Sequence, residues 1–343
     1  MDRWLNILGQ ELRYLLPLRS VREHARATDL VERNRHIDAF AFFWSFVVGT
    51  TPYYAIISGF LMWCVEDERI PTNPALARRA KSELPEDTGE RTTQQFWSDE
   101  DRTRLLRFVD QRAHDAIDED GSEATTEVRD RALVRVLAFS GCRTAKLVRD
   151  TRDDRRNGLF WTDVDLDSGT LRVLGKTQEW QDAQLPRQAR SVLSRHHRVQ
   201  QPPTDDWPVF PTAHAPTLYR HAREGLSERG LTDEEIETLL DESDVEDGLR
   251  EYGLAPPNLT TRSVRRILRS LCEEAGIDPE GAADYLQAHG ARRGLGDTLY
   301  RECGPGAAQR ALRHEDPQTT AKAYQHIDAG DLAEDVSEIF DDE

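Results

Sequence analysis

The sequence predicts a mainly α-helical protein with a small antiparallel β-sheet, an α+β fold arranged in two domains. A length of 343 residues is enough for two domains and a substantial core. Apolar residues recur at helical spacing in LNILGQELRYLLPL and LVERNRHIDAFAFFWSFVV near the start of the chain. The stretch FWTDVDLDSGTLRVLGKTQEWQDAQLP is typical of short strands around an Asp-Ser-Gly turn, with a second hairpin turn near residues 175–181.

A polar, proline-containing stretch at residues 81–95 divides the chain, and we interpret it as an interdomain linker. Residues 1–80 form the expected helical N-terminal region. The second domain begins at about Phe96 with a helix that Ser98 caps, followed by a buried helix that ends at Gly141. Further on, the acidic stretch SERGLTDEEIETLLDESDVEDGLREYG predicts a solvated helical insertion with no chemistry of its own.

The formal net charge of −18 argues, at first sight, against a nucleic-acid partner. DNA-binding surfaces gain affinity from Lys and Arg side chains that neutralise phosphates and release counterions. The acids are spread along the chain, however, and nearly all the basic residues are arginines, the four lysines being Lys81, Lys146, Lys176 and Lys322. We interpret this composition as whole-surface solvation suited to a salt-rich cytoplasm, where binding would depend on geometric phosphate contacts.

The cysteines and the apolar segments indicate a reducing cytoplasm. The four cysteines are far apart, and their spacing suggests neither a zinc site nor a disulfide framework. No secretory signal is evident. The uncharged run of residues 39–65 is long enough to cross a bilayer, but Gly49-Thr50-Thr51-Pro52 interrupts it in the middle. We therefore expect two buried core helices there and no membrane span.

Four short pieces of sequence carry residue types that phosphate chemistry needs. They are Ser140-Gly-Cys-Arg143, Gly175-Lys176, His289-Gly-Ala-Arg292, and Leu312-Arg-His314 followed by Thr319-Thr320 and Tyr324. Their order, with a helix before the first, a hairpin around the second and the last close to the C-terminus, resembles the catalytic domain of the tyrosine recombinase or phage integrase family. The resemblance covers residues 96–328, leaves 329–343 as an acidic C-terminal helix or tail, and has no counterpart for the acidic insertion.

The resemblance implies that four of these side chains surround a scissile phosphate. Arg143 and Arg292 would clamp its nonbridging oxygens, because paired guanidiniums bind them in a planar, bidentate way while negative charge builds up. His289 precedes Arg292 by three residues and shares its face of a helix. His314 would add a further donor to the same oxygens.

Tyr324 is the nucleophile that the resemblance implies. Its attack on phosphorus would give a 3′-phosphotyrosine, which conserves the bond energy for religation to a different strand. A phenol of ordinary pKa, about 10, must lose its proton for this, and the basic cluster would assist that loss. Lys176 falls where the family places a mobile hairpin lysine, and it would protonate the departing 5′ oxygen. No cofactor is required, neither a metal ion nor a nucleotide.

Each of these residues also has a plain structural interpretation. An arginine after a helix-ending glycine, such as Arg143, is typically a surface ion-pair partner. The two histidines would be structural, or would form a metal site with Asp284 and His326, although no tight ligand spacing supports a metal. Tyr324 would pack a helix, and Lys176 would decorate a turn.

Three residues depart from the family pattern. Lys146 stands where an acidic residue commonly follows the first arginine, Arg293 stands where a histidine is usual, and Arg313 replaces a glycine. In addition, Gly294 and Gly296 are expected to loosen the helix that carries the second arginine. These departures bear on activity more than on fold.

The N-terminal region combines two resemblances. The segment YYAIISGFLMWCVEDERIPTNPA looks like the last helix of the core-binding domain that precedes integrase catalytic domains and closes a clamp around DNA. The segment DLVERNRHIDAFAFFWSFVVG is similar to the N-terminal part of insertion-sequence transposases from salt-loving archaea. A fusion that replaced most of the clamp accounts for both.

The leading functional hypothesis is a site-specific recombinase or integrase of a mobile element. It would act on double-stranded DNA and self-associate there as a dimer or tetramer. A topoisomerase-like activity shares the same chemistry. Two alternatives are not enzymes: a catalytically impaired integrase remnant that only binds DNA, and a membrane-tethered protein. The tail DAGDLAEDVSEIFDDE predicts an amphipathic helix that docks on a neighbouring protomer or folds back on its own domain.

Overall fold

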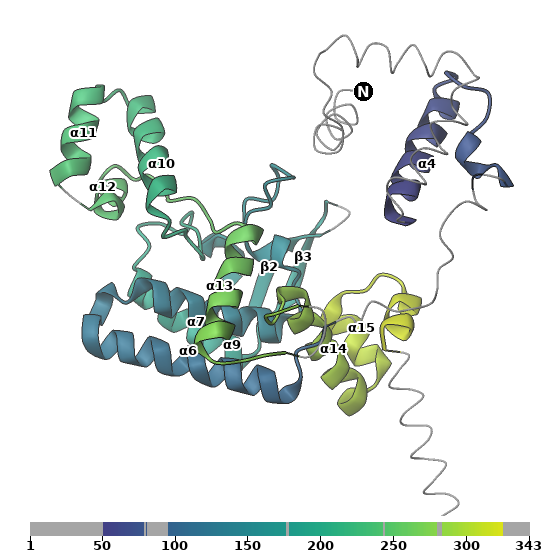
Figure 1. The fold of residues 1–343 in the computed structure, drawn as a ribbon. Helices are drawn as coiled ribbons and strands as arrows, with labels where there is room; N and C mark the ends of the chain where they lie inside the picture. Colours follow the sequence, from purple (N-terminus) through teal and green to yellow (C-terminus); the bar gives the residue numbers. More distant parts are fainter. Residues whose placement is uncertain are drawn as a thin grey trace, which may run out of the picture. The chain divides into compact units, whose positions relative to one another are not determined.

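The computed structural model describes residues 51–78, 80, 95–175, 178–242, 244–279 and 283–324 (Figure 1). The chain divides into two compact units, Met1–Arg91 and Thr92–Glu343. The described residues form helices and one three-stranded antiparallel sheet. The predicted α+β fold class is confirmed. The expectations for residues 1–50, for most of the linker and for the tail after residue 324 lie outside the described residues.

The described part of the first unit is a helical hairpin of modest size. Helix α4 (Thr51–Glu66) is followed by the 3-10 helix η1 (Pro74–Leu76), and Leu61, Cys64, Ile70 and Ala75 form a small buried core between them. Asn73 links the two elements, because its amide donates to the carbonyl of Ser58 and its oxygen accepts from the amide of Ala75. No described helix is both long and apolar enough to cross a membrane.

The core of the second unit is built around one buried helix. Helix α7 (Thr125–Ser140) packs against α6 (Asp99–Asp120), α9 (Arg187–Gln200) and α14 (Ala288–Cys303). Most of its residues are buried, including the charged pair Arg129 and Asp130, as expected of a helix surrounded by others. The capping prediction for α6 is confirmed, since Ser98 Oγ accepts from the amide of Asp101 at 3.1 Å.

The sheet lies beside this core and ends in the predicted hairpin. Strands β1 (Val164–Asp165), β2 (Thr170–Leu174) and β3 (Trp180–Gln184) are antiparallel in the order β1-β2-β3. Leu171 is paired with Ala183, and both side chains are buried, whereas their neighbours along the strands are more exposed. This alternation is the period of two that a half-buried strand requires.

Short elements connect these main ones. They are the helices α8 (Thr144–Leu147) and α15 (Pro305–Leu312), the 3-10 helices η2 (Gly121–Glu123) and η3 (Trp161–Asp163), and a helical segment at residues 317–324. The α8 turn follows α7 directly, and α15 packs against α14. These connections bring the ends of α7, α14 and α15 together.

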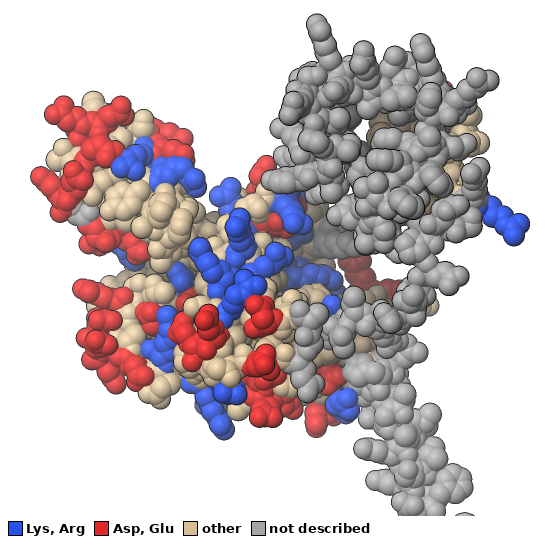
Figure 2. Space-filling view, viewed as in Figure 1, with Lys and Arg blue, Asp and Glu red and all other residues tan. Residues whose placement is uncertain are grey.

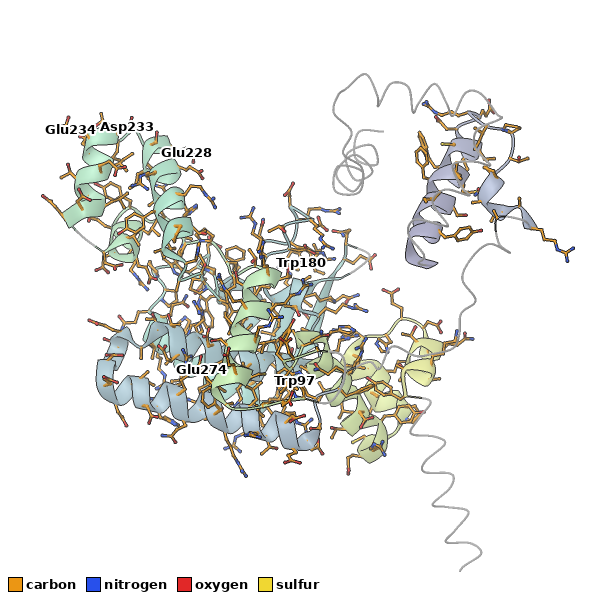
Figure 3. All side chains as sticks on the ribbon, viewed as in Figure 1. Trp97, Trp180, Glu228, Asp233, Glu234 and Glu274 are labelled. Carbon is orange, nitrogen blue, oxygen red and sulfur yellow. The ribbon has the colours of Figure 1, made fainter. Side chains whose placement is uncertain are left out.

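The acidic insertion is a helical subdomain with its own core, as the sequence predicts. It consists of α10 (Ala215–Glu228), α11 (Asp233–Glu242) and α12 (Val245–Glu251), which bury Leu226, Ile236 and Leu249 among other residues. Figure 2 shows acidic side chains gathered over its outer end, where Figure 3 labels Glu228, Asp233 and Glu234. The two ends of the insertion meet, because the amide of Thr212 donates to the carbonyl of Pro257 at 2.8 Å.

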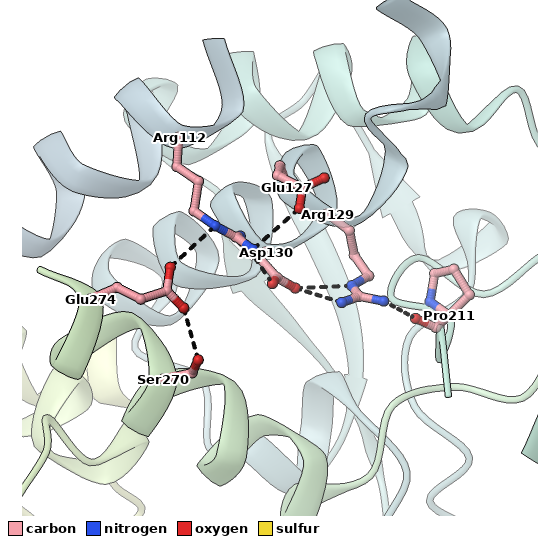
Figure 4. Close-up of polar contacts among 7 residues, drawn as sticks. All are labelled: Arg112, Glu127, Arg129, Asp130, Pro211, Ser270 and Glu274. Atoms are coloured by element: carbon pink, nitrogen blue, oxygen red, sulfur yellow. Dashed lines mark hydrogen bonds and ion pairs between the residues drawn. The ribbon is translucent and has the colours of Figure 1, made fainter. Parts of the chain in front are cut away.

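A buried polar network fixes helix α13 (Thr261–Glu274) and the base of the insertion to the core (Figure 4). Arg129 and Asp130 are both about 5% exposed and form an ion pair at 2.7 Å. Arg129 also donates to the carbonyl of Pro211, where the insertion begins. Arg112 reaches both Asp130 and Glu274, the last residue of α13. Since buried charges are tolerated only when paired, this network holds α6, α7, α13 and the base of the insertion together.

Candidate active site

Arg143 follows the glycine turn that ends helix α7. Gly141 adopts a left-handed conformation with φ of +64°, and a Cβ there would meet the carbonyl oxygen of Ala311 at 3.1 Å. Cys142 is then buried, and its amide donates to Ser140 Oγ. The next side chain, Arg143, is therefore turned out to solvent at the start of α8.

Arg292 lies opposite, buried in helix α14 with 4% of its surface exposed. Its guanidinium donates to the carbonyl of Gly141 and, at 2.5 Å, to the carbonyl of Leu312. These two carbonyls end α7 and α15, so the arginine fixes the spacing between the Arg143 turn and the turn before His314. Each terminal nitrogen carries a second hydrogen, which leaves donors for a ligand.

The two predicted histidines come from either side of this arginine. His289 lies in the first turn of α14 and is exposed. His314 is partly buried, and its Nδ1 lies 2.8 Å from the hydroxyl of buried Thr320. That contact holds the imidazole in place and leaves Nε2 for another partner.

The electrostatics show that the four side chains share one site. Burial lowers the pKa of His314 to about 4, and Arg292 and Arg143 lower it further. His289 keeps an exposed surface, but the protein around its ring displaces part of the water. This loss of hydration, followed by Arg293, Arg292, Arg143 and His314, lowers the pKa of His289 to about 4. The pKa of Arg292 is lowered to about 10 by burial and then by Arg143 and Arg313. Among the described residues, no carboxylate contributes to these shifts, whereas Arg143, Arg292 and Arg313 do, so this arrangement favours an anion.

Two basic residues join this cluster that sequence reasoning treated only as departures. Lys146 is buried, with its Nζ donating to Gln181 Oε1 at 3.2 Å, and burial followed by Arg313 lowers its pKa to about 8. Arg313 has φ of +54°, the left-handed conformation that glycine favours at a helix end. Its guanidinium contacts Gln184 and Cys142. Both basic residues thus tie strand β3 to the site.

Tyr324 lies at the edge of the cluster but is turned into the protein. It is 1% exposed, packs edge-on against Phe96, and its hydroxyl donates to the carbonyl of Arg293 at 3.4 Å. Burial raises its pKa to about 12, although Arg292 opposes the rise. Arg292 and Arg293 lower this pKa, as expected of the basic cluster, but burial has the larger effect in the conformation seen here.

The two glycines of α14 allow close packing. A Cβ at Gly294 would lie 2.5 Å from the carbonyl oxygen of Trp97, and one at Gly296 would lie 1.8 Å from the hydroxyl of Tyr324. We expected them to loosen the helix; instead, each leaves room for a neighbour that no side chain at that position would permit.

Lys176 lies outside the described residues, but the stem of its hairpin is well defined. The amide of Gly175 donates to the carbonyl of Glu179, and Arg156 donates to the carbonyls of Leu174 and Gly175. Trp180 (labelled in Figure 3) is 53% exposed on this hairpin. The guanidinium of Arg172 stacks on its ring. Of the alternative metal ligands, His326 lies outside the described residues and Asp284 pairs with Arg269 at 3.5 Å.

Comparison with known proteins identifies the family. The model of the phage integrase family matches residues 107–330, more than half of the chain. The chain therefore belongs to the phage integrase family, the tyrosine recombinases. A search of the curated proteins finds no match.

Solved structures share the fold at low sequence identity. The integrase of transposon Tn1549, in complex with a circular intermediate DNA, is 13% identical with a TM-score of 0.52, and 94% of each chain is covered. The site-specific recombinase XerH, bound to a palindromic difH substrate in a post-cleavage complex, is 17% identical with a TM-score of 0.46. That match covers 74% of this chain and 55% of the XerH chain, so this chain spans about half of that relative.

Proposed function

We propose that this protein is a site-specific DNA recombinase, or integrase, that cleaves and rejoins double-stranded DNA through a covalent 3′-phosphotyrosine. The observation that carries the proposal is the cluster of Arg143, His289, Arg292 and His314 next to a buried tyrosine. Its two guanidiniums are cationic and its two imidazoles are neutral, and no described carboxylate is among the groups that shift their pKa values. Such a cluster suits a phosphodiester, whose negative charge grows on the nonbridging oxygens during the reaction.

In the proposed reaction, the Tyr324 oxygen bonds to phosphorus and its proton passes to the neutral imidazole of His289, while the bond from phosphorus to the 5′ oxygen breaks. Arg143 and Arg292 hold the nonbridging oxygens, and the carbonyls that position Arg292 keep its remaining hydrogens directed at one place. The leaving 5′ oxygen takes a proton from a cationic donor, for which we propose Lys176. Attack by a 5′-hydroxyl on the phosphotyrosine reverses the step and rejoins a strand.

Before cleavage, Tyr324 must leave its buried position. A tyrosine with a pKa of about 12 is a poor nucleophile at neutral pH, and its hydroxyl contacts a backbone carbonyl. A phosphate bound in the cluster would pair with the cations next to the hydroxyl. Movement of the Tyr324 ring out of the protein toward this phosphate would remove the effect of burial on its pKa. Cleavage is thereby coupled to DNA binding.

Each part of the chain has a role in the proposed recombinase. Residues 96–328 would be the catalytic domain, 81–95 the linker, and 1–80 a shortened core-binding region with a transposase-like start. The acid-rich surface suits a salt-rich cytoplasm, and the gene would belong to a mobile element of a halophilic archaeon. Dimers or tetramers would assemble on DNA, with the tail of residues 329–343 as one contact.

A recombinase remnant that binds DNA without cleaving it is the second candidate. One observation favours it: Tyr324 is buried and its pKa is raised, so that the nucleophile is withheld in the structure. The same fold and the same cation cluster would then serve only to bind a phosphate. The two candidates agree on binding and differ on covalent chemistry.

The experiment that separates them uses a nicked suicide substrate at high salt. Duplexes nicked beside candidate attachment sites trap the intermediate, because the short strand diffuses away after cleavage. The wild type is expected to give a DNA-linked protein band on a denaturing gel, and Tyr324→Phe is expected to bind the same duplex without forming that band. Binding by the wild type with no covalent band at any candidate site would favour the remnant.

A further inference from the structure

A second basic surface lies outside the cation cluster, in an open groove with a volume of about 690 Å³. One wall is the exposed face of α13, the other is the start of α10 in the insertion, and the floor includes the residues just after α8 and before α13. No acidic residue lines it. The arginines that line it are Arg149, Arg220, Arg262, Arg265, Arg266 and Arg269.

These arginines are exposed, and most have no acidic partner. Arg269 pairs weakly with Asp284 at 3.5 Å and stacks on Tyr285. None of the other five forms an ion pair with any residue that the structure describes. The chain has a net charge of −18. A groove lined by six arginines, five of them without an ion-pair partner among the described residues, is therefore a local positive region in an acidic protein.

The position of the arginines on α13 points away from a stabilising role. Arg262, Arg265 and Arg266 lie in the N-terminal half of the helix, and its first turn contains no acid. Cations near a helix N-terminus oppose the helix dipole, so these arginines lower the stability of the helix. An anionic ligand at this end would reverse that effect, since both the dipole and the guanidiniums would attract it.

Both walls of the groove are held in place. At the far end of α13, Glu274 contacts Arg112 and accepts a hydrogen bond from Ser270, and buried Arg129 holds the carbonyl of Pro211 at the base of the insertion (Figure 4). The separation of the walls is thus set by the core. Hydroxyl groups of Thr217, Thr260 and Ser263 add neutral donors of the kind that contact phosphates.

The insertion itself is divided by charge. Its outer end carries Glu228, Asp233 and Glu234, well away from α13 (Figure 3), while Arg220 lines the groove. Figure 2 shows blue side chains over α13 and red ones over the outer end of the insertion. The acidic face repels DNA on the outside, so it directs a duplex to the inner, basic face.

We propose that the insertion is one jaw of a clamp on duplex DNA, with Arg220 on this jaw and the arginines of α13 across the groove contacting the phosphate backbone. The inference rests on the proposed function for its choice of ligand. It replaces the expectation that the insertion is solvated and has no chemistry of its own.

A matched pair of substitutions on α10 tests the proposal. Arg220 lines the groove, whereas Arg223, three residues later on the same helix, is exposed and paired with Glu237 at 2.6 Å. We expect Arg220→Ala to weaken binding of duplex DNA about 3- to 10-fold and to reduce the slope of log Kd against log salt by about 0.9, the value for one phosphate contact. Arg223→Ala, with the same change in charge, should leave both unchanged.

Removing the insertion gives the sharper contrast. Because Thr212 and Pro257 are hydrogen-bonded, a short Gly-Ser linker can replace residues 214–255, with a thermal melt to verify folding. The deletion removes net negative charge, so simple electrostatics predicts tighter binding to DNA. The clamp predicts weaker binding and a smaller salt slope.

All binding is measured on Tyr324→Phe full-length protein, so the result does not depend on cleavage. Failure of the proposed function would be seen separately, as absence of a covalent band with the wild type on nicked DNA. Equal affinity and slope for Arg220→Ala and Arg223→Ala, or tighter binding after the deletion, would overturn the clamp. A change in oligomeric state without a change in salt slope would also overturn it, since the groove would then hold an acidic protein segment.

Discussion

The cation cluster and the α13 groove both collect arginines, but they hold them in opposite ways. Arg292 in the cluster is buried and bonded to two backbone carbonyls, whereas Arg262 and Arg265 in the groove are exposed and have no acidic partner among the described residues. A guanidinium with fixed orientation suits one phosphate in one geometry. Exposed guanidiniums suit a series of phosphates whose exact positions vary with the duplex. Cleavage therefore requires an arginine in one fixed orientation, whereas binding of the DNA backbone does not.

The largest effect is expected from replacing the fixed arginine. Arg292→Lys keeps the charge but cannot contact both carbonyls and present a planar pair of donors to phosphate. We expect the cleavage rate in single-turnover experiments to fall about 100-fold or more, the size typical of a lost oxyanion donor. DNA affinity should change far less. Equal losses of rate and affinity would mean that Arg292 acts in the same way as the groove arginines.

The buried polar network that fixes α13 to the core allows a buried ion pair to be compared with an exposed one by the free energy of unfolding. Asp130→Ala would leave Arg129 buried and without its partner, and we expect the free energy of unfolding to fall by about 3–5 kcal/mol. Glu237→Ala, which breaks the exposed pair with Arg223, is the matched control and should cause little change. Urea denaturation measures both. A similar loss in the two variants would contradict the anchoring role of the network.

A smaller effect is expected where the tyrosine meets α14. Gly296→Ala would place a methyl group against the hydroxyl of Tyr324, and we expect a destabilisation of about 1–3 kcal/mol from overpacking. The control is Gly59→Ala in α4, where nothing lies within 4 Å and alanine should stabilise the helix. Opposite signs of the two changes in unfolding midpoint are predicted. A stabilised Gly296→Ala variant would mean that Tyr324 is not held in the buried position in solution.

The smallest predicted effect is a pH dependence from the cluster. His314 has a pKa of about 4 in the folded protein, below the ordinary 6.5, so unfolded chains bind more protons between these values. Its contribution to stability is therefore complete above pH 6.5 and is lost as the pH falls toward 4. His314→Gln should flatten the decline in unfolding free energy over that window relative to the wild type. Identical pH profiles for the two proteins would contradict the lowered pKa.

The grouping of these residues into one site was expected from the resemblance to tyrosine recombinases, and local signals in the sequence support parts of it. Gly141 after an apolar helix predicts the turn that presents Arg143, and the spacing of His289 and Arg292 predicts a shared helix. The contacts of Lys146 and Arg313 were not predictable, since their partners Gln181 and Gln184 lie on a strand far from either residue in the sequence.

The groove and the buried tyrosine were also beyond sequence reasoning. Arg149, Arg220 and the arginines of α13 come from three separate parts of the chain, and only the folded insertion brings Arg220 opposite α13. A regular series of arginines on one helix, without acids in its first turn, was the signal available. The burial of Tyr324 depends on a missing side chain at Gly296, and such an absence is visible only when the two segments are seen in contact.

The most direct test of the central claim is to identify the protein residue that becomes linked to DNA. Wild-type protein is trapped on nicked duplex, digested with protease and nuclease, and the modified peptide is sequenced by mass spectrometry. A 3′-phosphate on Tyr324, with a free 5′-hydroxyl on the released strand, is the predicted result. Linkage to another residue, or a 5′-phosphate on the released strand, would contradict the account.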